Sequence, residues 1–263
     1  MGNKIVDELS NIYNHRNVLK SLVVKHLFGV YKNSFLGFAW HFVMPVIMLF
    51  VYYIAFSALN KNSIDYFWIY LGVGIFPFTF MIGNLTTGTG CITSNGDLIN
   101  KIYFPREILV LAQVISSFII MCMGLSVVLV LMLIVGFSIN LAVMPMIVVI
   151  IVLMFIFVLG YVLLFSSLNV YARDVQFFLN SVNMIFFFLT PMYFTVESTS
   201  GMLSTVIWIN PYTYYIEGFH DIIYRGVLPS STVCIGALVY SSVAIIIGLI
   251  VFKKLKKGFA ERM

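Results

Sequence analysis

From residue 37 onward, the chain consists of long apolar runs separated by short polar segments. The runs are continuous, without the regular alternation of apolar and polar residues that marks a barrel strand. A transmembrane helix needs roughly 20 apolar residues, whereas a barrel strand needs about 10 in strict alternation. The pattern therefore predicts an all-α integral membrane protein with six transmembrane helices. The six expected spans cover about residues 37–59, 66–85, 108–136, 144–168, 176–196 and 231–252.

Two of these runs are expected to depart from a straight helix that just spans the bilayer. The run 108–136 is longer than one crossing requires, so we expect it to tilt or to extend beyond the bilayer. In the run 176–196, Thr190 is followed by Pro191. Because proline removes a helix hydrogen bond, the helix should end or kink at this pair.

Polar segments complete the predicted organisation. Residues 1–36 carry apolar residues at helical spacing and several basic residues, which is typical of an amphipathic arm in the cytoplasmic membrane interface. Weak helix formers at 14–17 should divide this arm into two short helices. Residues 86–107 form a polar loop, and 197–229 a semi-polar outer segment. We expect a transmembrane domain over 37–252, followed by a basic cytoplasmic tail at 253–263.

Composition and charge support this prediction and orient the chain. Of the 263 residues, 61% are hydrophobic and 10% are charged, against about 25% charged in soluble domains, which excludes a soluble enzyme and a disordered chain. If the N-terminus is cytoplasmic, thirteen of the fifteen Lys and Arg residues lie on that side, and Lys61 and Arg225 lie outside. The positive-inside rule thus predicts a multi-pass protein of the cytoplasmic (inner) membrane with both termini cytoplasmic.

Motifs for enzymatic chemistry are absent from the sequence. There is no GxxxxGK[ST] phosphate loop, no HExxH or GxSxG motif, and no carboxylate pair inside an apolar run. The three cysteines are widely spaced, so burial among apolar residues is the better interpretation than a metal site. We expect no catalytic residue, no metal, no cofactor bound by this chain and no nucleic-acid partner.

Glu217, His220 and Asp221 are the polar residues closest to a membrane-embedded site. Their i, i+3, i+4 spacing places them on one face if the segment is helical. Two interpretations remain open. They form a polar lining or gate on the outer side of a transport path, or they are the ordinary solvated face of an extracellular helix.

Aromatic residues are concentrated around Pro191 and the pair Asn210–Pro211. Anchoring at the membrane interface explains most of the aromatic residues in the chain. Aromatic faces also suit the apolar faces of sugar rings, and tyrosine hydroxyls can donate hydrogen bonds. An aromatic-lined path for sugars is therefore the alternative hypothesis. The concentrated residues are Phe186, Phe187, Phe188, Tyr193, Phe194, Trp208, Tyr212, Tyr214 and Tyr215.

Several patches resemble the permease subunits of type-2 ABC exporters, in particular the branch that exports lipid-linked polysaccharides such as O-antigen, capsule or teichoic acid. The most distinctive is NGDLINKIYFPREIL at 95–109, which resembles that family's loop before span three. One departure is His220, because many relatives have Arg there, and this weakens the case for an essential fixed charge. The other patches are YKNSFLGFAW at 31–40 followed by Pro45, NVYARDVQ at 169–176 leading to LTPMYF, NPYTYYIEGF at 210–219, and the terminal KKLKKGFAERM.

The resemblance implies a role for the polar loop 86–107. Residues 92–101 are expected to form a short coupling helix that fits a cleft on a separate ATPase subunit, where ATP and Mg²⁺ bind. It also implies a homodimer of this chain assembled with two copies of the ABC ATPase. The residues expected to couple the ATPase to transport are Asn95, Asp97, Leu98, Ile99, Lys101, Phe104, Pro105, Arg106 and Glu107.

The resemblance also implies a transport path between the two permeases, lined largely by spans one and five. The segment 197–229 would supply re-entrant or gate helices between spans five and six. ATP binding and hydrolysis are expected to move the coupling helix as a rigid lever that opens the path. The residues expected in the path or gate are Trp40, Phe187, Tyr193, Trp208, Tyr212, Tyr214, Glu217 and His220.

Other functions remain open from the sequence. A type-2 ABC permease that exports drugs or small lipids would use the same fold. An intramembrane lipid-modifying enzyme would have Glu217, His220 and Asp221 as its only candidate catalytic residues. These residues are expected on the outer side, away from activated donor substrates in the cytoplasm. A membrane scaffold is the third alternative. Co-purification with an ATPase and activity of the pair in liposomes distinguish a scaffold from an exporter.

Overall fold

The computed structural model describes residues 10–29, 34–58, 64–101 and 104–262, and all regular elements in these ranges are helical. The predicted all-α fold class is therefore confirmed. The first nine residues of the expected arm, and Lys61, lie outside the described residues. The α-helices are α2 (Arg16–Gly29), α3 (Trp40–Ser57), α4 (Phe67–Gly83), α5 (Gly96–Lys101), α6 (Glu107–Val135), α7 (Pro145–Tyr171), α8 (Asp174–Leu189), α9 (Met202–Ile209), α10 (Pro211–Phe219), α11 (Ser231–Leu255) and α12 (Phe259–Arg262).

Five helical segments in the described ranges are long and apolar enough to cross a membrane, and they correspond to the expected spans one, two, three, four and six. The expected fifth span corresponds to α8, which is apolar but has 16 residues. A helix of that length rises about 24 Å, less than the roughly 30 Å of a bilayer core. The count of six spans is therefore not confirmed by helix length. The five segments are Gly37–Ser57, Phe67–Gly88, Glu107–Val135, Pro145–Tyr171 and Ser231–Gly258.

The end of α8 lies where the Thr190–Pro191 pair predicts it. Thr190 has an extended backbone, with φ −90° and ψ 128°, because the ring of the following proline disfavours the helical conformation. Its hydroxyl donates to the carbonyl of Phe186 at 2.6 Å. Asn210, at the start of α10, donates from Nδ2 to Thr190 Oγ1 at 2.9 Å. The break after α8 is thus held against the start of α10.

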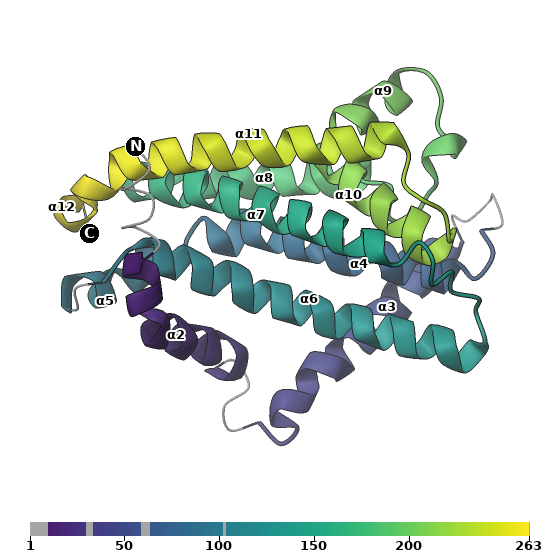
Figure 1. Cartoon of the computed structure of the whole chain (residues 1–263), viewed down its shortest axis with the longest axis horizontal. Coiled ribbons are helices and arrows are strands. Elements are labelled where there is room, and N and C mark those ends of the chain that lie inside the picture. Colours follow the sequence, from purple (N-terminus) through teal and green to yellow (C-terminus); the bar gives the residue numbers. More distant parts are fainter. Residues whose placement is uncertain (1–9, 30–33, 59–63, 102–103, 263) are drawn as a thin grey trace.

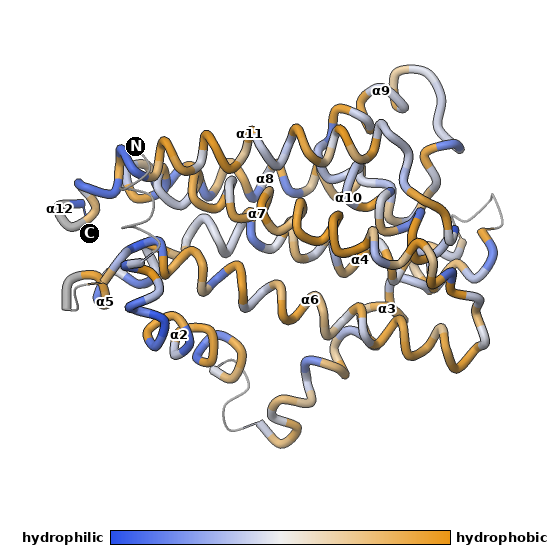
Figure 2. Tube along the Cα trace, in the orientation of Figure 1, coloured by the Kyte–Doolittle hydropathy of each residue, from blue (hydrophilic) through white to orange (hydrophobic). Residues whose placement is uncertain are grey.

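The long helices α4, α6, α7 and α11 run along the long axis of the molecule (Figure 1). Helices α2, α5 and α12 gather at one end, which we call the basic end, and α9 lies at the other, which we call the α9 end. Figure 2 shows apolar residues along the lengths of these helices and hydrophilic residues concentrated at the ends, most heavily at the basic end. This distribution matches an apolar belt bounded by two polar surfaces.

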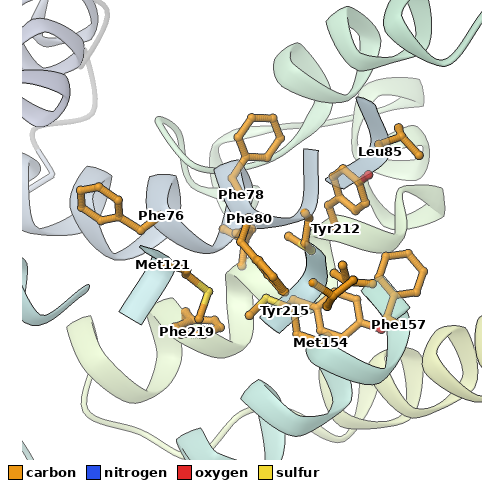
Figure 3. Packing of buried hydrophobic residues seen from close by; sticks show 14 of the residues in the cluster. Phe76, Phe78, Phe80, Leu85, Met121, Met154, Phe157, Tyr212, Tyr215 and Phe219 are labelled. Atoms are coloured by element: carbon orange, nitrogen blue, oxygen red, sulfur yellow. The ribbon is translucent and has the colours of Figure 1, made fainter. Parts of the chain in front are cut away.

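Helix α4 is the centre of the bundle. Most of α4 is buried, whereas most of α3 faces outward. Side chains from α4, α6, α7 and α10 meet in one core (Figure 3). The short helix α10 therefore completes the core, although it belongs to the semi-polar segment. The labelled core side chains are Phe76, Phe78, Phe80, Leu85, Met121, Met154, Phe157, Tyr212, Tyr215 and Phe219.

Helices α7 and α11 pack at unusually close range. A Cβ atom at Gly160 would collide with the backbone of Ala244, and one at Gly248 would collide with the carbonyl of Gly160. Small residues allow such close backbone approach in membrane helices. The contact makes α7 and α11 a tightly joined pair.

The amphipathic arm folds back on the start of α6. After a turn at His15, α2 runs from Arg16, close to the break that the weak helix formers predict. Its Leu22 packs with Phe104, Ile108 and Leu109 at the basic end. The basic side chains of α2 remain on the outer face, where Arg16, Lys20 and Lys25 are exposed.

Candidate functional site

An ion cluster lies at the α9 end, around the guanidinium of Arg225. Its Nη1 lies 2.7 Å from Glu217 Oε2 and 2.7 Å from Asp221 Oδ1. Its Nη2 lies 3.6 Å from Oε2 of Glu197, whose side chain is largely exposed. We call Glu197, Glu217, His220, Asp221 and Arg225 the Arg225 cluster.

The local sequence explains how α10 presents this cluster. Asn210 caps the helix by accepting a 3.0 Å hydrogen bond from the amide of Tyr212, and Pro211 occupies the first helical position. Helix α10 then continues into a π-helical turn, His220–Tyr224. Glu217, Asp221 and Arg225 are spaced by four residues, so one face of this continuous helix carries both acids and their base.

His220 joins α10 to the central helix α4. Its side chain is fully buried, its ring stacks on Tyr70 with centroids 3.8 Å apart, and its Nε2 lies 3.0 Å from the carbonyl oxygen of Tyr70. Gly74 leaves room for the imidazole, since a Cβ there would lie 2.9 Å from Nε2. Nδ1 of His220 faces Glu217 Oε1 at 3.7 Å.

The Arg225 cluster lies outside the five candidate spans. Burial raises the pKa of the Glu217 carboxyl, but His220 and Arg225 outweigh burial and hold that pKa below its usual value. Burial lowers the pKa of Arg225, and the two neighbouring carboxylates more than reverse this effect. At Asp221 burial has the larger effect, and its pKa is raised. Arg225 thus pairs with both the buried Glu217 and the half-buried Asp221, and His220 also faces Glu217.

These contacts decide between the two interpretations of the polar face. Glu217 is 4% exposed and His220 is 0% exposed, so an ordinary solvated face is wrong for both residues. Their predicted role in a gate stays a prediction. Sequence reasoning missed Tyr70 and counted Arg225 only as an outer charge. The i, i+4, i+8 spacing of Glu217, Asp221 and Arg225 is the signal by which Arg225 could have been found.

The aromatic residues expected in the path fall into separate groups. Tyr193 stacks on Phe56 with centroids 4.4 Å apart and lies near Phe187, so one group joins α3 and α8. The hydroxyl of Tyr214 donates to the carbonyl of Trp208 at 2.6 Å, so a second group joins α9 and α10.

The remaining two aromatic candidates, Tyr212 and Trp40, make other contacts. Tyr212 is buried in the core against Phe157 and Phe186. Trp40 donates from Nε1 to Ser34 Oγ at 2.8 Å, at the first residue of α3. It is 16 residues, or about 24 Å of helix, from Phe56. The structure therefore does not bring the eight expected path residues into one array within a single chain.

The basic end carries a second ion cluster. Arg106 Nη1 donates to the backbone carbonyl of Lys256 at 2.8 Å, and Lys256 Nζ lies 2.6 Å from Glu107 Oε1. We call Arg106, Glu107 and Lys256 the Lys256 cluster. Close by, the hydroxyl of Tyr171 donates to the carbonyl of Leu255 at 3.0 Å. The ends of α6, α7 and α11 are thus connected at the basic end.

The residues expected to couple an ATPase divide into three sets. Leu98, Ile99 and Phe104 face the arm in the apolar cluster around Leu22. Arg106 and Glu107 contact Lys256, which sequence reasoning did not single out.

The third set lies at or near α5. Asp97 is exposed on α5, and Asn95 donates from Nδ2 to the carbonyl of Cys91 at 2.8 Å. Pro105 is half-buried just before α6. The side chain of Lys101 lies outside the described residues.

Comparison of the sequence with protein-family profiles identifies the family of this chain. The profile of the ABC-2 type transporter family matches residues 17–224, which is most of the chain. The chain belongs to the ABC-2 type transporter family. Permeases of this family are transport subunits without an ATPase site of their own, and membership implies a membrane location and an ABC ATPase partner.

Curated ABC-2 relatives resemble the chain over nearly its whole length. An "O-antigen export system permease protein RfbA" of Klebsiella pneumoniae is 28% identical over 232 residues, covering 88% of this chain and 89% of the relative. A protein of the same name from Myxococcus xanthus is 28% identical over 253 residues, covering 95% and 96%.

The ABC-2 match begins in α2 and ends with the π-helical turn after α10. It therefore contains the polar loop 86–107 and the acids and histidine of the Arg225 cluster, and it ends one residue before Arg225 itself. Helix α11 and Lys256 lie beyond the matched range. The Lys256 cluster thus joins the segment after this match to the end of the loop 86–107 within it.

Proposed function

We propose that this chain is the permease subunit of an ATP-driven exporter that moves a lipid-linked polysaccharide across the cytoplasmic membrane. The observation that carries the proposal is the similarity, over about nine-tenths of the chain, to permeases named for O-antigen export. The absence of a phosphate loop from the sequence fits a subunit whose motor is another protein. ATP and Mg²⁺ bind to that ATPase partner.

The proposed assembly contains two copies of this chain and two ATPase subunits. Helices α3 and α8 support this arrangement because each carries a face of large apolar residues that the rest of the chain leaves uncovered. These include Phe50 and Ile54 on α3, and Phe177 and Phe188 on α8. In the assembly, the two copies enclose the path between their α3 and α8 helices, and residues 174–196 complete a sixth crossing.

The orientation follows from charge. The basic end faces the cytoplasm, both termini are cytoplasmic, and α5 meets the ATPase. Anionic lipids attract the exposed lysines at this end. The α9 end then faces outward, and α9 with α10 forms the outer gate of the path. Short α5 is the coupling helix, and its exposed Asp97 meets the ATPase directly.

Gene deletion followed by lipid analysis tests the cargo. Cells that lack the chain should accumulate an undecaprenyl-linked polymer on the cytoplasmic side, and the chain with its co-purifying ATPase should export that polymer from proteoliposomes upon addition of ATP. An unchanged lipid-linked pool, with ATP-dependent movement of drugs or small lipids instead, contradicts polysaccharide export and supports the alternative ABC-2 cargo. Failure to co-purify any ATPase contradicts both.

A further inference from the structure

Two consecutive residues at the start of α6 bind the same residue of the C-terminal tail. Arg106 directly precedes α6 and Glu107 is its first residue, whereas Lys256 directly follows α11. The partners are about 150 positions apart in the chain. The contact is therefore a tertiary joint between the coupling loop and the end of the last long helix.

The two bonds of this joint differ in chemistry. Glu107 pairs with the ammonium group of Lys256, and the side chains are only 18% and 28% exposed. Arg106 donates instead to the backbone carbonyl of Lys256, where the last turn of a helix leaves carbonyls without partners and favours a cation. Substituting Lys256 removes the ion pair and leaves the carbonyl in place, so the ion pair can be tested separately.

Helix α11 connects this joint to the rest of the bundle. It is packed tightly on α7 through Gly160 and Gly248. Further along, the hydroxyl of Tyr215 on α10 lies 2.7 Å from Ser241 Oγ on α11. A displacement of the coupling loop that carries Lys256 with it would therefore move α11 together with α7 and the base of α10.

We propose that Lys256 is a positioning residue for coupling, and that its ion pair with Glu107 makes α11 and α7 follow the coupling loop when the ATPase moves it. The proposal rests on the proposed function. Without the ion pair the ATPase still docks on α5, but the movement of the coupling loop displaces α11 less than in the wild type. ATP is then hydrolysed with less export, which is a loss of coupling and not of assembly.

Charge reversal and charge exchange test the joint in the complete complex in proteoliposomes. Glu107→Lys and Lys256→Glu should each lower the polymer exported per ATP hydrolysed by about fivefold, with the ATPase still bound. The double variant Glu107→Lys/Lys256→Glu should recover to within about twofold of wild type, because the opposite charges face each other again. If the two residues acted independently of each other, the double variant would show no such recovery of the ratio.

Lys257→Glu is the matched control, since it changes the charge equally at an exposed neighbouring position. It should leave the ratio unchanged. Lys256→Met and Glu107→Gln repeat the test without a reversed charge if either reversal prevents insertion. The proposal is overturned if the single variants behave like Lys257→Glu, or if the exchange fails to restore the ratio. If the wild-type complex itself shows no ATP-dependent export, the proposed function is contradicted. That outcome differs from a failure of the Lys256 proposal, in which the wild-type complex exports and the variants match Lys257→Glu.

Discussion

The two ion clusters at opposite ends of the bundle use similar side chains in different ways. The Arg225 cluster is built mainly from one continuous helix, and its Glu217 is 5% exposed at the side chain. The Lys256 cluster joins segments 150 residues apart, with side chains 18% and 28% exposed. The first holds a helix in the core, and the second holds two helix ends together.

The two clusters differ in burial, so we expect substitutions in them to affect different properties of the protein. Removing one partner of a buried ion pair leaves an uncompensated charge, which destabilises the fold strongly. A partly exposed pair contributes little to stability, because water replaces the lost partner. A contact of the second kind can break and re-form during a transport cycle at small cost. The comparison therefore predicts large stability effects at the α9 end and functional effects at the basic end.

The largest expected effect is at α5 and the residues after it. Reversing the charges at Asp97, Lys101 and Arg106 should abolish stimulation of the partner ATPase while leaving the chain inserted, because these groups lie in the loop proposed to contact the ATPase. ATPase assays and membrane fractionation measure the two quantities. Unchanged stimulation would show that the coupling loop lies elsewhere.

Glu217→Ala should lower the free energy of unfolding by about 3 kcal/mol, because Arg225 loses its most buried counter-charge. Thermal unfolding of the purified protein in detergent measures the loss. Glu197→Ala is the control: its carboxylate is 71% exposed, and the same cluster should tolerate its removal. Equal losses for the two variants would mean that burial does not distinguish the acids.

Gly74→Ala should cost about 2 kcal/mol, because the added methyl group would press on the His220 ring and on the backbone of Met192, at 2.9 and 3.2 Å. The same unfolding measurement applies. Gly83→Ala on α4 is the matched control, since a Cβ there meets nothing within 4 Å and alanine favours the helix. A neutral Gly74→Ala would indicate that the contact between α4 and His220 is loose.

Alanine at Tyr193, Trp208 or Tyr214 should lower export several-fold and leave assembly with the ATPase intact, because an aromatic face contributes about 1 kcal/mol to stacking. Tyr212→Ala is the contrasting variant, since that ring is buried in the core and its loss should lower stability instead. Normal export with all three residues replaced would refute an aromatic sugar path.

The smallest expected effect on stability is that of Glu107→Gln. Its loss should be below about 1 kcal/mol, because the pair with Lys256 is partly exposed. The free energies of unfolding of Glu107→Gln and Glu217→Ala, measured side by side in detergent, compare the two clusters directly. A loss at Glu107 as large as that at Glu217 would contradict the division between a core-holding and a joint-forming cluster.

Helix positions could be predicted from sequence because they depend on local properties. A continuous apolar run needs only its own composition to select a helix in a bilayer, and five of the six expected spans correspond to long helices. The break after α8 was also predictable, because proline acts on its immediate neighbours. The length of α8 was not, since the apolar run continues past Pro191 in residues that do not extend the helix.

The candidate sites depended on the tertiary structure to a greater degree. The face shared by Glu217, Asp221 and Arg225 follows from spacing along one helix, but its burial does not. Burial of His220 arises from Tyr70 and Gly74 on α4, about 150 residues earlier in the chain. The aromatic residues look like one group in the sequence, yet the fold distributes them among separate contacts.

By itself, the sequence determined that this protein is an all-helical membrane protein of a recognisable transporter type, and it predicted that most positive charges lie on the cytoplasmic side. These properties follow from composition, periodicity and local motifs, which act over a few residues. Only the tertiary structure decided that α10 enters the core, that Arg225 pairs with the buried Glu217, and that Arg106 and Glu107 meet Lys256. Such contacts join distant segments, and their partners become neighbours only when the packing of α4, α7 and α11 brings the helix ends together.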